Sequence, residues 1–135
     1  MAIPEYVSMY KLDVGCGQGS WVYEQSKHKE DFVIGVDRDA YRGWFENKKR
    51  NVQFFIADAR HLPFKDKAFS YVHSGSMSEL DAKGVSEAAS EMQRVLREGD
   101  VYFTVNAFTP EEERVRAWKK RNARLKELRG LWLRK

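Results

Sequence analysis

Residues 12–20 read LDVGCGQGS, a short apolar run with a carboxylate, then three glycines at alternate positions and a hydroxyl residue. This order predicts a strand, a tight turn and the start of a helix, with Ser20 able to cap that helix. Glycine suits such a turn because the backbone must bend sharply and approach a ligand without Cβ atoms in the way. The first amides of the following helix lack intrahelical partners and carry partial positive charge. A nucleotide-like or carboxylate-bearing ligand is therefore expected here.

The spacing of the glycines distinguishes between nucleotide ligands. A dinucleotide-binding turn has the pattern G-x-G-x-x-G. Here the third glycine, Gly19, comes one residue early, and Ser20 stands where that pattern has glycine. The pattern D-x-G-x-G-x-G, which begins at Asp13, resembles motif I of the class I methyltransferases that use S-adenosylmethionine. The alternative is a glycine turn between a strand and a helix that binds no ligand.

A second carboxylate follows the next apolar run. Residues 32–36 (FVIGV) predict a buried strand that ends at Asp37. Strands that alternate with helices form parallel sheets, and open sheets of this kind bind ligands outside the carboxyl ends of their strands. A carboxylate at that edge is placed to accept hydrogen bonds from two ribose hydroxyls. The alternative role is a helix cap, which suits Asp39 better because it precedes the helical stretch 40–49.

A third strand, predicted over residues 51–57, also ends in a carboxylate, Asp58. The segment from Ala57 to Phe64 resembles the methyltransferase pattern G/A-D-A-x-x-L-P-F. That resemblance implies that Asp58 meets the amino group of adenine and that the backbone amide of Ala59 meets a ring nitrogen. A carboxylate suits the first contact because it accepts hydrogen bonds from an amine. The alternative is an ordinary turn at the end of a strand.

The remaining elements continue the alternation of strands and helices. Residues 68–73 predict a fourth strand and residues 101–105 a fifth. A helix between them begins at Asp81 or Ser86 and runs to about residue 97. The end of this helix, EMQRVLREG (residues 91–99), resembles the family's E-x-x-R-V-L-K-P-G-G. The chain departs from the family at Ser70, where Asp is usual, and at Glu98 and Asp100, which replace a proline and a glycine.

Together these motifs make residues 9–105 resemble the class I S-adenosylmethionine-dependent methyltransferases. The resemblance implies an α/β protein with a three-layer α-β-α Rossmann-like methyltransferase fold. Its mainly parallel sheet would have about five strands in the order 3-2-1-4-5. The chain is short for the family, and we expect the sheet to lack most of the usual C-terminal hairpin. We expect residues 1–135 to form a single S-adenosylmethionine-binding domain that ends in a basic helix over residues 110–135.

The resemblance also implies the cofactor, S-adenosyl-L-methionine, and the residues that bind it. Its methyl group is already activated, so the protein must mainly align an acceptor and exclude water. No catalytic residue is assigned on this basis. A general base, if the reaction uses one, would be Glu79 or His73, although alternation along the strand points His73 into a packing layer. The expected cofactor-binding residues are Asp13, Gly15, Gly17, Gly19, Asp37, Arg38, Asp58, Ala59 and Ser74.

Composition narrows the setting in which the protein works. The chain has 135 residues and one cysteine, which excludes an internal disulfide. One cysteine and three scattered histidines also predict no metal site. No apolar run approaches the ~20 residues that span a bilayer, and the first residues do not resemble a signal peptide. We therefore expect a cytoplasmic protein with no membrane partner.

Positive charge is concentrated near the C-terminus. Residues 111–135 contain ten Lys or Arg and four Asp or Glu, a balance of +6, whereas the whole chain carries +4. With Trp118 and Trp132, this segment is suited to hold the phosphates and stack on the bases of a nucleic acid; alternatively, its charges only face water. The apolar fifth strand needs a cover, either this basic helix or a second copy of the chain in a homodimer.

Two functions are consistent with the sequence. The first is a methyltransferase that acts on an unidentified methyl acceptor, either a nucleic acid or a small molecule. The second is a non-catalytic S-adenosylmethionine-binding or scaffold subunit that a partner completes. The intact set of expected cofactor residues favours the first.

Overall fold

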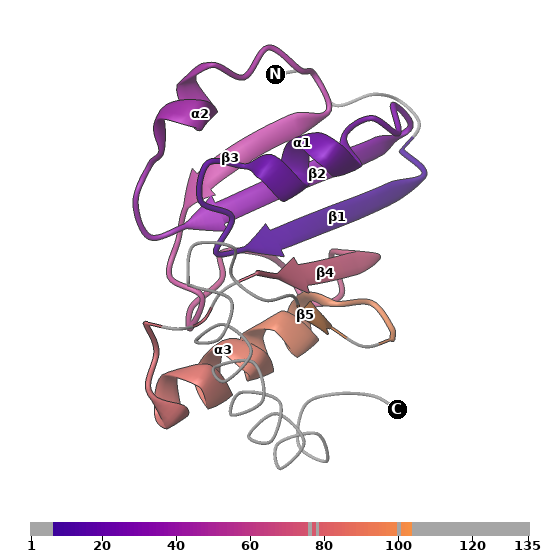
Figure 1. Cartoon of the computed structure of the whole chain (residues 1–135). Helices are drawn as coiled ribbons and strands as arrows, with labels where there is room; N and C mark the ends of the chain where they lie inside the picture. Colours follow the sequence, from indigo (N-terminus) through magenta and orange to yellow (C-terminus); the bar gives the residue numbers. More distant parts are fainter. Residues whose placement is uncertain (1–6, 76, 78, 100, 104–135) are drawn as a thin grey trace, which may run out of the picture.

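The protein is built on a parallel sheet of five strands in the order β3-β2-β1-β4-β5 (Figure 1). The computed structural model describes residues 7–75, 77, 79–99 and 101–103. The elements are β1 (Met9–Val14), α1 (Ser20–Gln25), β2 (Asp31–Asp37), α2 (Arg42–Phe45), β3 (Val52–Ile56), β4 (Tyr71–Ser74), α3 (Ala82–Val95) and β5 (Tyr102–Phe103). The predicted strand order and Rossmann-like fold are confirmed. The predicted basic helix over residues 110–135 and the region of the C-terminal hairpin lie outside the described residues.

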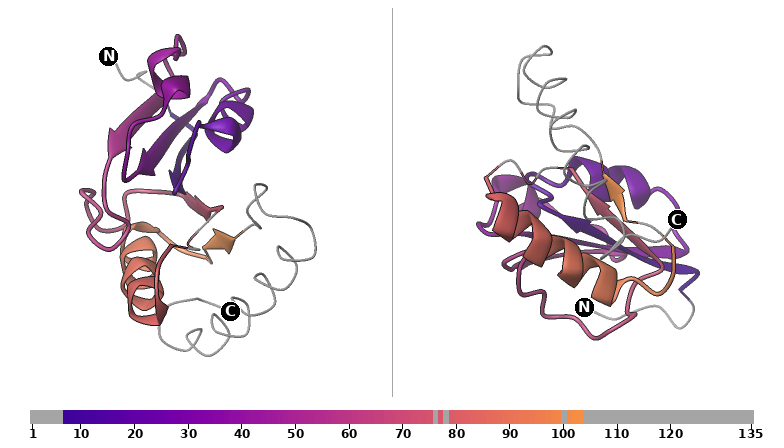
Figure 2. Two further views of the ribbon diagram at one scale, coloured as in Figure 1. Left: turned by 60° about the vertical axis from the view of Figure 1, so that its left-hand side comes forward. Right: turned by 90° about the horizontal axis from the view of Figure 1, so that it is seen from below.

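Helices cover both faces of the sheet, which gives the three layers (Figure 2). α3 lies against one face, and α1 and α2 lie against the other. In the described segments, no helix is long and apolar enough to cross a membrane. All four strand pairs run parallel, so the carboxyl ends of β1, β2, β3 and β4 meet at one edge of the sheet.

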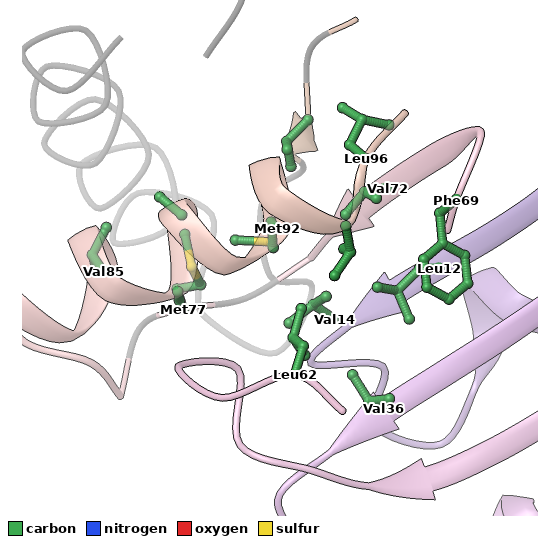
Figure 3. Close-up of a cluster of buried hydrophobic side chains, with 14 residues drawn as sticks. Leu12, Val14, Val36, Leu62, Phe69, Val72, Met77, Val85, Met92 and Leu96 are labelled. Atoms are coloured by element: carbon green, nitrogen blue, oxygen red, sulfur yellow. The ribbon is translucent and has the colours of Figure 1, made fainter. Parts of the chain in front are cut away.

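The larger core fills the space between the sheet and α3. Side chains alternate along a strand, so Leu12 and Val14 of β1 point to this face together with Val36 of β2 and Val72 of β4. Figure 3 shows them gathered with the apolar residues of α3 around Met92. Each of these strand side chains is at most 1% exposed. Burial of an aliphatic side chain of this size contributes about 1.5–3 kcal/mol, so this cluster is a main source of stability.

A second, smaller core lies under α1 and α2. Val33 of β2 and Val52 of β3 are fully buried with Val22 of α1. Aromatic rings cover them: the Trp44 ring stacks on Phe54 with ring centroids 5.1 Å apart. The aromatic content of this face matters for the site, because Trp44 and Phe54 both contact the glycine turn or its close surroundings.

The N-terminal ends of two helices differ in how they are capped. The N-cap of α1 is Gly19, in a left-handed conformation with no side-chain cap, and Ser20 is the first helical residue. The expectation that Ser20 caps this helix was wrong. α3 begins as predicted from Asp81, whose carboxylate accepts a hydrogen bond from the Gly84 amide at 2.7 Å. The alternative start at Ser86 is excluded, since Ser86 lies inside α3.

α2 is much shorter than the predicted helix over residues 40–49. It begins after Tyr41, its N-cap, so Asp39 caps no helix and that expectation was wrong. The helix stops because the Asn47 side chain bonds the local backbone instead. Its amide donates to the Val52 carbonyl at 3.0 Å, and its oxygen accepts from the Lys49 amide at 2.9 Å. Asparagine favours turns by this kind of local competition.

Two other boundaries shift by a few residues. β4 covers Tyr71–Ser74, three residues later than the predicted start at residue 68. β5 is described only at Tyr102–Phe103, and residues 104 and 105 of the predicted strand lie outside the described residues. Neither of these shifts changes which strand ends meet at the carboxyl edge.

Candidate functional site

The glycine turn after β1 folds back over the end of β2. The amides of Gly15 and Cys16 both donate to the Val36 carbonyl, at 2.9 and 3.0 Å. Gly15, Gly17 and Gly19 all have positive φ values, of 76°, 54° and 96°. L-residues with a Cβ rarely adopt this conformation. At Gly19 a steric reason is added, since a Cβ there would lie 2.7 Å from Cζ of Phe54.

Asp37 closes this turn from the end of β2. Its Oδ2 accepts a hydrogen bond from the Gly17 amide at 2.9 Å, and its Oδ1 accepts one from the Arg38 amide at 2.7 Å. The sheet edge therefore brings together two features that lie 20 residues apart in sequence. An ionised carboxylate offers about four lone-pair positions. The half-buried Asp37 therefore retains acceptor positions for donors from a ligand.

α2 holds the turn from the other side through contacts that sequence analysis did not identify. The Trp44 Nε1–H donates to the Gly17 carbonyl at 2.7 Å, and the Gly43 amide donates to Oε1 of Gln18 at 2.8 Å. The Tyr23 hydroxyl in turn donates to the Gly43 carbonyl at 2.5 Å. A Cβ on Gly43 would collide with the Gln18 backbone oxygen. An Arg-Gly-Trp sequence inside a predicted helix carried no signal for these contacts.

Asp58, after β3, is clamped by a nearby arginine. Arg60 Nε lies 3.1 Å from Oδ1 and 3.2 Å from Oδ2 of Asp58, and Arg60 Nη2 lies 2.8 Å from Oδ2. The Arg60 amide donates to Oδ1 at 2.9 Å. These hydrogen bonds lower the pKa of Asp58 to about 2. A bond from the Ala57 amide to the Asp37 carbonyl, at 2.9 Å, ties this segment to the end of β2. Arg60 was not among the predicted site residues.

Asp13 lies inside the sheet layer rather than in the turn. Its Oδ1 is 2.7 Å from Nδ1 of His73, its register partner on β4, and both side chains are almost fully buried. The Trp21 indole stacks on the His73 ring with centroids 4.3 Å apart. Burial raises the pKa of Asp13, against the lowering effect of His73. His73 thus points into the packing layer, as alternation predicted, and this burial argues against its use as a general base.

Ser74 and Cys16 are also turned inward. The Ser74 hydroxyl donates to the Val14 carbonyl at 3.0 Å, and the residue is 1% exposed. Cys16 is buried, and burial raises the pKa of its thiol well above the usual range, which leaves it a protonated spacer in the turn. A ligand over this edge would therefore meet Ser74 through its backbone and not through its hydroxyl.

The last two predicted residues, Arg38 and Ala59, follow β2 and β3 at the carboxyl edge. Arg38, after β2, has its Nη1 3.6 Å from Oε2 of Glu79, in the loop after β4. Both side chains are well exposed, so this pair contributes little to stability. Because β1 lies between β2 and β4, the pair bridges the space beside the end of β1. Ala59 is half-buried beside Asp58.

Comparison with known proteins agrees with this architecture. A family model described as a methyltransferase domain matches residues 12–99, the part that contains the glycine turn, Asp37 and Asp58. The chain belongs to this methyltransferase family. The methyltransferase domain is 32% identical over 108 residues to a demethylmenaquinone methyltransferase of Staphylococcus aureus, covering 76% of this chain and 44% of that protein. The chain spans less than half the length of the curated relatives it matches.

Solved structures give the same result. The domain superposes on the PH0226 protein from Pyrococcus horikoshii with a TM-score of 0.62 and 27% identity, covering 84% of this chain and 52% of that one. It superposes on a SAM-dependent methyltransferase from Methanosarcina mazei with a TM-score of 0.58 and 25% identity, covering 75% and 52%. The fold around the carboxyl edge is therefore shared with a methyltransferase of which this chain covers about half.

Proposed function

We propose that this chain is an S-adenosylmethionine-dependent methyltransferase whose cofactor lies over the carboxyl edge of β1, β2 and β3. One observation carries the proposal: the Gly17 amide bonds the Asp37 carboxylate at 2.9 Å. This contact joins the glycine turn, whose backbone a ligand can approach closely, to the Asp37 carboxylate, which can still accept hydrogen bonds from a ligand. Membership of the methyltransferase family and likeness to a SAM-dependent methyltransferase support the same function.

The residues of the edge fit the chemical groups of this cofactor. Asp37 retains acceptor positions for two ribose hydroxyls, and Asp58 offers a carboxylate to the adenine amino group. The glycine turn would hold the amino-acid end, because positive-φ glycines let a ligand approach the backbone closely. The proposed contacts are made by Asp13, Gly15, Gly17, Gly19, Asp37, Arg38, Asp58, Ala59 and Ser74, with Asp13 acting through its place in the sheet and Ser74 through its backbone.

The chain's own contribution to the reaction is placement. When bound, S-adenosylmethionine supplies a methyl group that its sulfonium has already activated. The protein then needs to fix the cofactor rigidly and bring an acceptor into line with the methyl–sulfur bond. The network of Trp44, Gly43 and Tyr23 supplies this rigidity, since it ties the glycine turn to α2.

The acceptor in this proposal is a nucleic acid or a small molecule. The Staphylococcus relative is named for demethylmenaquinone, which makes demethylmenaquinone the first small molecule to assay. RNA and DNA form the second set, because of the positive charge of residues 111–135.

The test of this function has two parts. Calorimetric titration with S-adenosylhomocysteine is expected to show one site per chain with micromolar affinity. Incubation with S-adenosylmethionine labelled in the methyl group is then expected to transfer label to one of these acceptors. No binding would contradict the proposal; binding without transfer to any acceptor would instead favour a non-catalytic cofactor-binding subunit.

A further inference from the structure

The Asp58 carboxylate, at the end of a strand and partly exposed, is held by several hydrogen bonds from a single residue, Arg60. Arg60 reaches both of its oxygens, at 2.8 Å for the shortest guanidinium contact, and adds its own backbone amide at 2.9 Å. The two residues are separated only by Ala59, so side chain and backbone of one residue surround the same carboxylate. The Asp58 side chain is 34% exposed and that of Arg60 44% exposed, so the pair lies at the surface of the edge.

The backbone around this pair is already fixed by other bonds. The Asp58 carbonyl accepts from the His61 amide at 2.9 Å, and the Leu62 amide donates to Oε2 of Glu91 on α3 at 2.8 Å. Because the backbone is fixed, the Asp58 carboxylate can change its orientation only by rotation of its side chain. The hydrogen bonds from Arg60 restrict that rotation. The hydrogen bond and charge of Asp58 raise the pKa of Arg60, and the charges of Glu87 and Asp81 add smaller effects in the same direction.

We propose that Arg60 is a positioning residue that orients the Asp58 carboxylate toward the amino group of adenine and so makes the site selective for adenine among purines. This inference rests on the proposed function. Three N–H groups of Arg60 (its amide, Nε and Nη2) donate to the carboxylate, with the Nε–H shared between both oxygens, so about one of its four acceptor positions is left for a further donor. An adenine 6-amino group donates there. A 6-oxo group only accepts, and it would place a second oxygen against the carboxylate.

The chemistry of arginine suits this role. Its planar fork contacts a carboxylate at two points and fixes orientation, whereas lysine supplies a single point charge. The same contact lowers the pKa of Asp58 to about 2. A ligand with a 6-oxo group is disfavoured because its oxygen would lie against the negatively charged carboxylate.

If Arg60 competed with the ligand for Asp58, removing Arg60 would change the ligand affinity in the opposite direction. If Arg60 merely occupied Asp58 and had to leave before the ligand bound, its removal would strengthen binding. Positioning predicts instead that its removal weakens binding, and only for ligands that carry the amino group. The choice of ligand pair therefore separates the two effects.

The experiment titrates S-adenosylhomocysteine and its deaminated counterpart, S-inosylhomocysteine, into the full chain by calorimetry. The wild type is expected to prefer the adenosine form by about tenfold or more. Arg60→Ala is expected to lose about tenfold in affinity for S-adenosylhomocysteine but to change less than about twofold for S-inosylhomocysteine. Arg60→Lys is expected to keep part of the preference. Arg50→Ala is the matched control: Arg50 is exposed and precedes β3 at the opposite end of the strand.

Each other outcome overturns the inference in a distinct way. Tighter binding by Arg60→Ala would show that Arg60 competes with the ligand. Equal weakening of both ligands would show a general role in loop structure, and unchanged affinities would show no role. If the wild type binds neither ligand, the proposed function fails first; if the wild type binds and Arg60→Ala keeps its preference, only this inference fails. Circular dichroism melting checks that the variants are folded.

Discussion

Asp37 is the residue on which the glycine turn and the proposed ribose contact both depend. Replacing it with alanine removes the acceptor for the Gly17 amide and the proposed acceptor for two hydroxyls. We expect Asp37→Ala to weaken S-adenosylhomocysteine binding by about 1–3 kcal/mol, the range for hydrogen bonds to a charged group. Asp39→Ala is the control, since Asp39 is exposed and caps no helix. Equal affinity of wild type and Asp37→Ala in calorimetry would refute the ribose assignment.

Substitution of Gly19 with alanine tests whether the turn needs glycine only for its left-handed backbone conformation or also because a Cβ would collide with Phe54. Gly19 and Gly99 have nearly equal positive φ values, 96° and 102°, but a Cβ would meet Phe54 at Gly19 and nothing within 4 Å at Gly99. In both alanine variants the left-handed backbone costs about 1–2 kcal/mol. Gly19→Ala adds the collision, so its free energy of unfolding in urea should fall further, and S-adenosylhomocysteine binding should fall with it. Equal losses of stability at the two positions would contradict a steric role for Gly19.

Single-residue roles were only partly accessible from the sequence. Asp37 and Asp58 were identified because each ends an apolar strand, and the parallel sheet brings such ends to one edge. The partner of Asp13 was not foreseen, because the pairing with His73 depends on the register of β1 against β4. Arg60 was missed although a carboxylate followed two residues later by arginine permits this local clamp. Trp44 was missed because its contact with Gly17 joins two elements that are 27 positions apart.

At the scale of elements, Arg94 joins α3 to the segment that carries Asp58. Its guanidinium donates to the carbonyls of Leu62 and Phe64, at 2.9 and 2.7 Å, and bonds the carboxylates of Glu91 and Asp66. We expect Arg94→Met to lower the free energy of unfolding by about 2 kcal/mol, because two carbonyls and Glu91 lose a charged donor. Arg97→Met, at an exposed position after α3, is the control and should leave urea unfolding unchanged.

The same contact predicts a pH dependence. The hydrogen bonds from Arg94 hold the pKa of Glu91 below its usual value. A carboxyl whose pKa is lower in the folded state stabilises the protein above its unfolded pKa, about 4.3, and this contribution is lost as the pH falls through the folded value. The stability difference between wild type and Arg94→Met should therefore be full at pH 7 and shrink below about pH 4. A difference that grew on acidification would contradict this origin.

Element order was predictable, whereas element length was less so. Five apolar runs, most of them separated by helical stretches, predict a parallel sheet, whereas the strand order with β1 at its centre was an expectation from the resemblance to the methyltransferase family. The length of α2 was not predictable, because Asn47 and the contacts of Gly43 and Trp44 with the glycine turn compete with helix formation. Those contacts exist only once the sheet has assembled.

At the scale of the whole molecule, positive charge is concentrated in residues 111–135 and not in the rest of the chain. Residues 119–121 and 48–50 both read KKR, but only the first triplet lies in the segment with a charge balance of +6. If residues 111–135 bind nucleic acid, changing 119–121 to glutamine should weaken binding of single-stranded RNA and lower the salt slope by about 0.7 for each phosphate that is no longer neutralised. Changing 48–50 should have little effect. Equal effects in fluorescence anisotropy would assign the binding to net charge alone.

The cofactor site is tested most directly by a crystal structure of the chain with S-adenosylhomocysteine. We predict the ribose hydroxyls within hydrogen-bond distance of the Asp37 carboxylate and the adenine amino group within that distance of Asp58. The homocysteine carboxylate should lie over the glycine turn of residues 15–19. A ligand bound elsewhere on the molecule, or one whose ribose makes no contact with Asp37, would contradict the assignment of the carboxyl edge as the cofactor site.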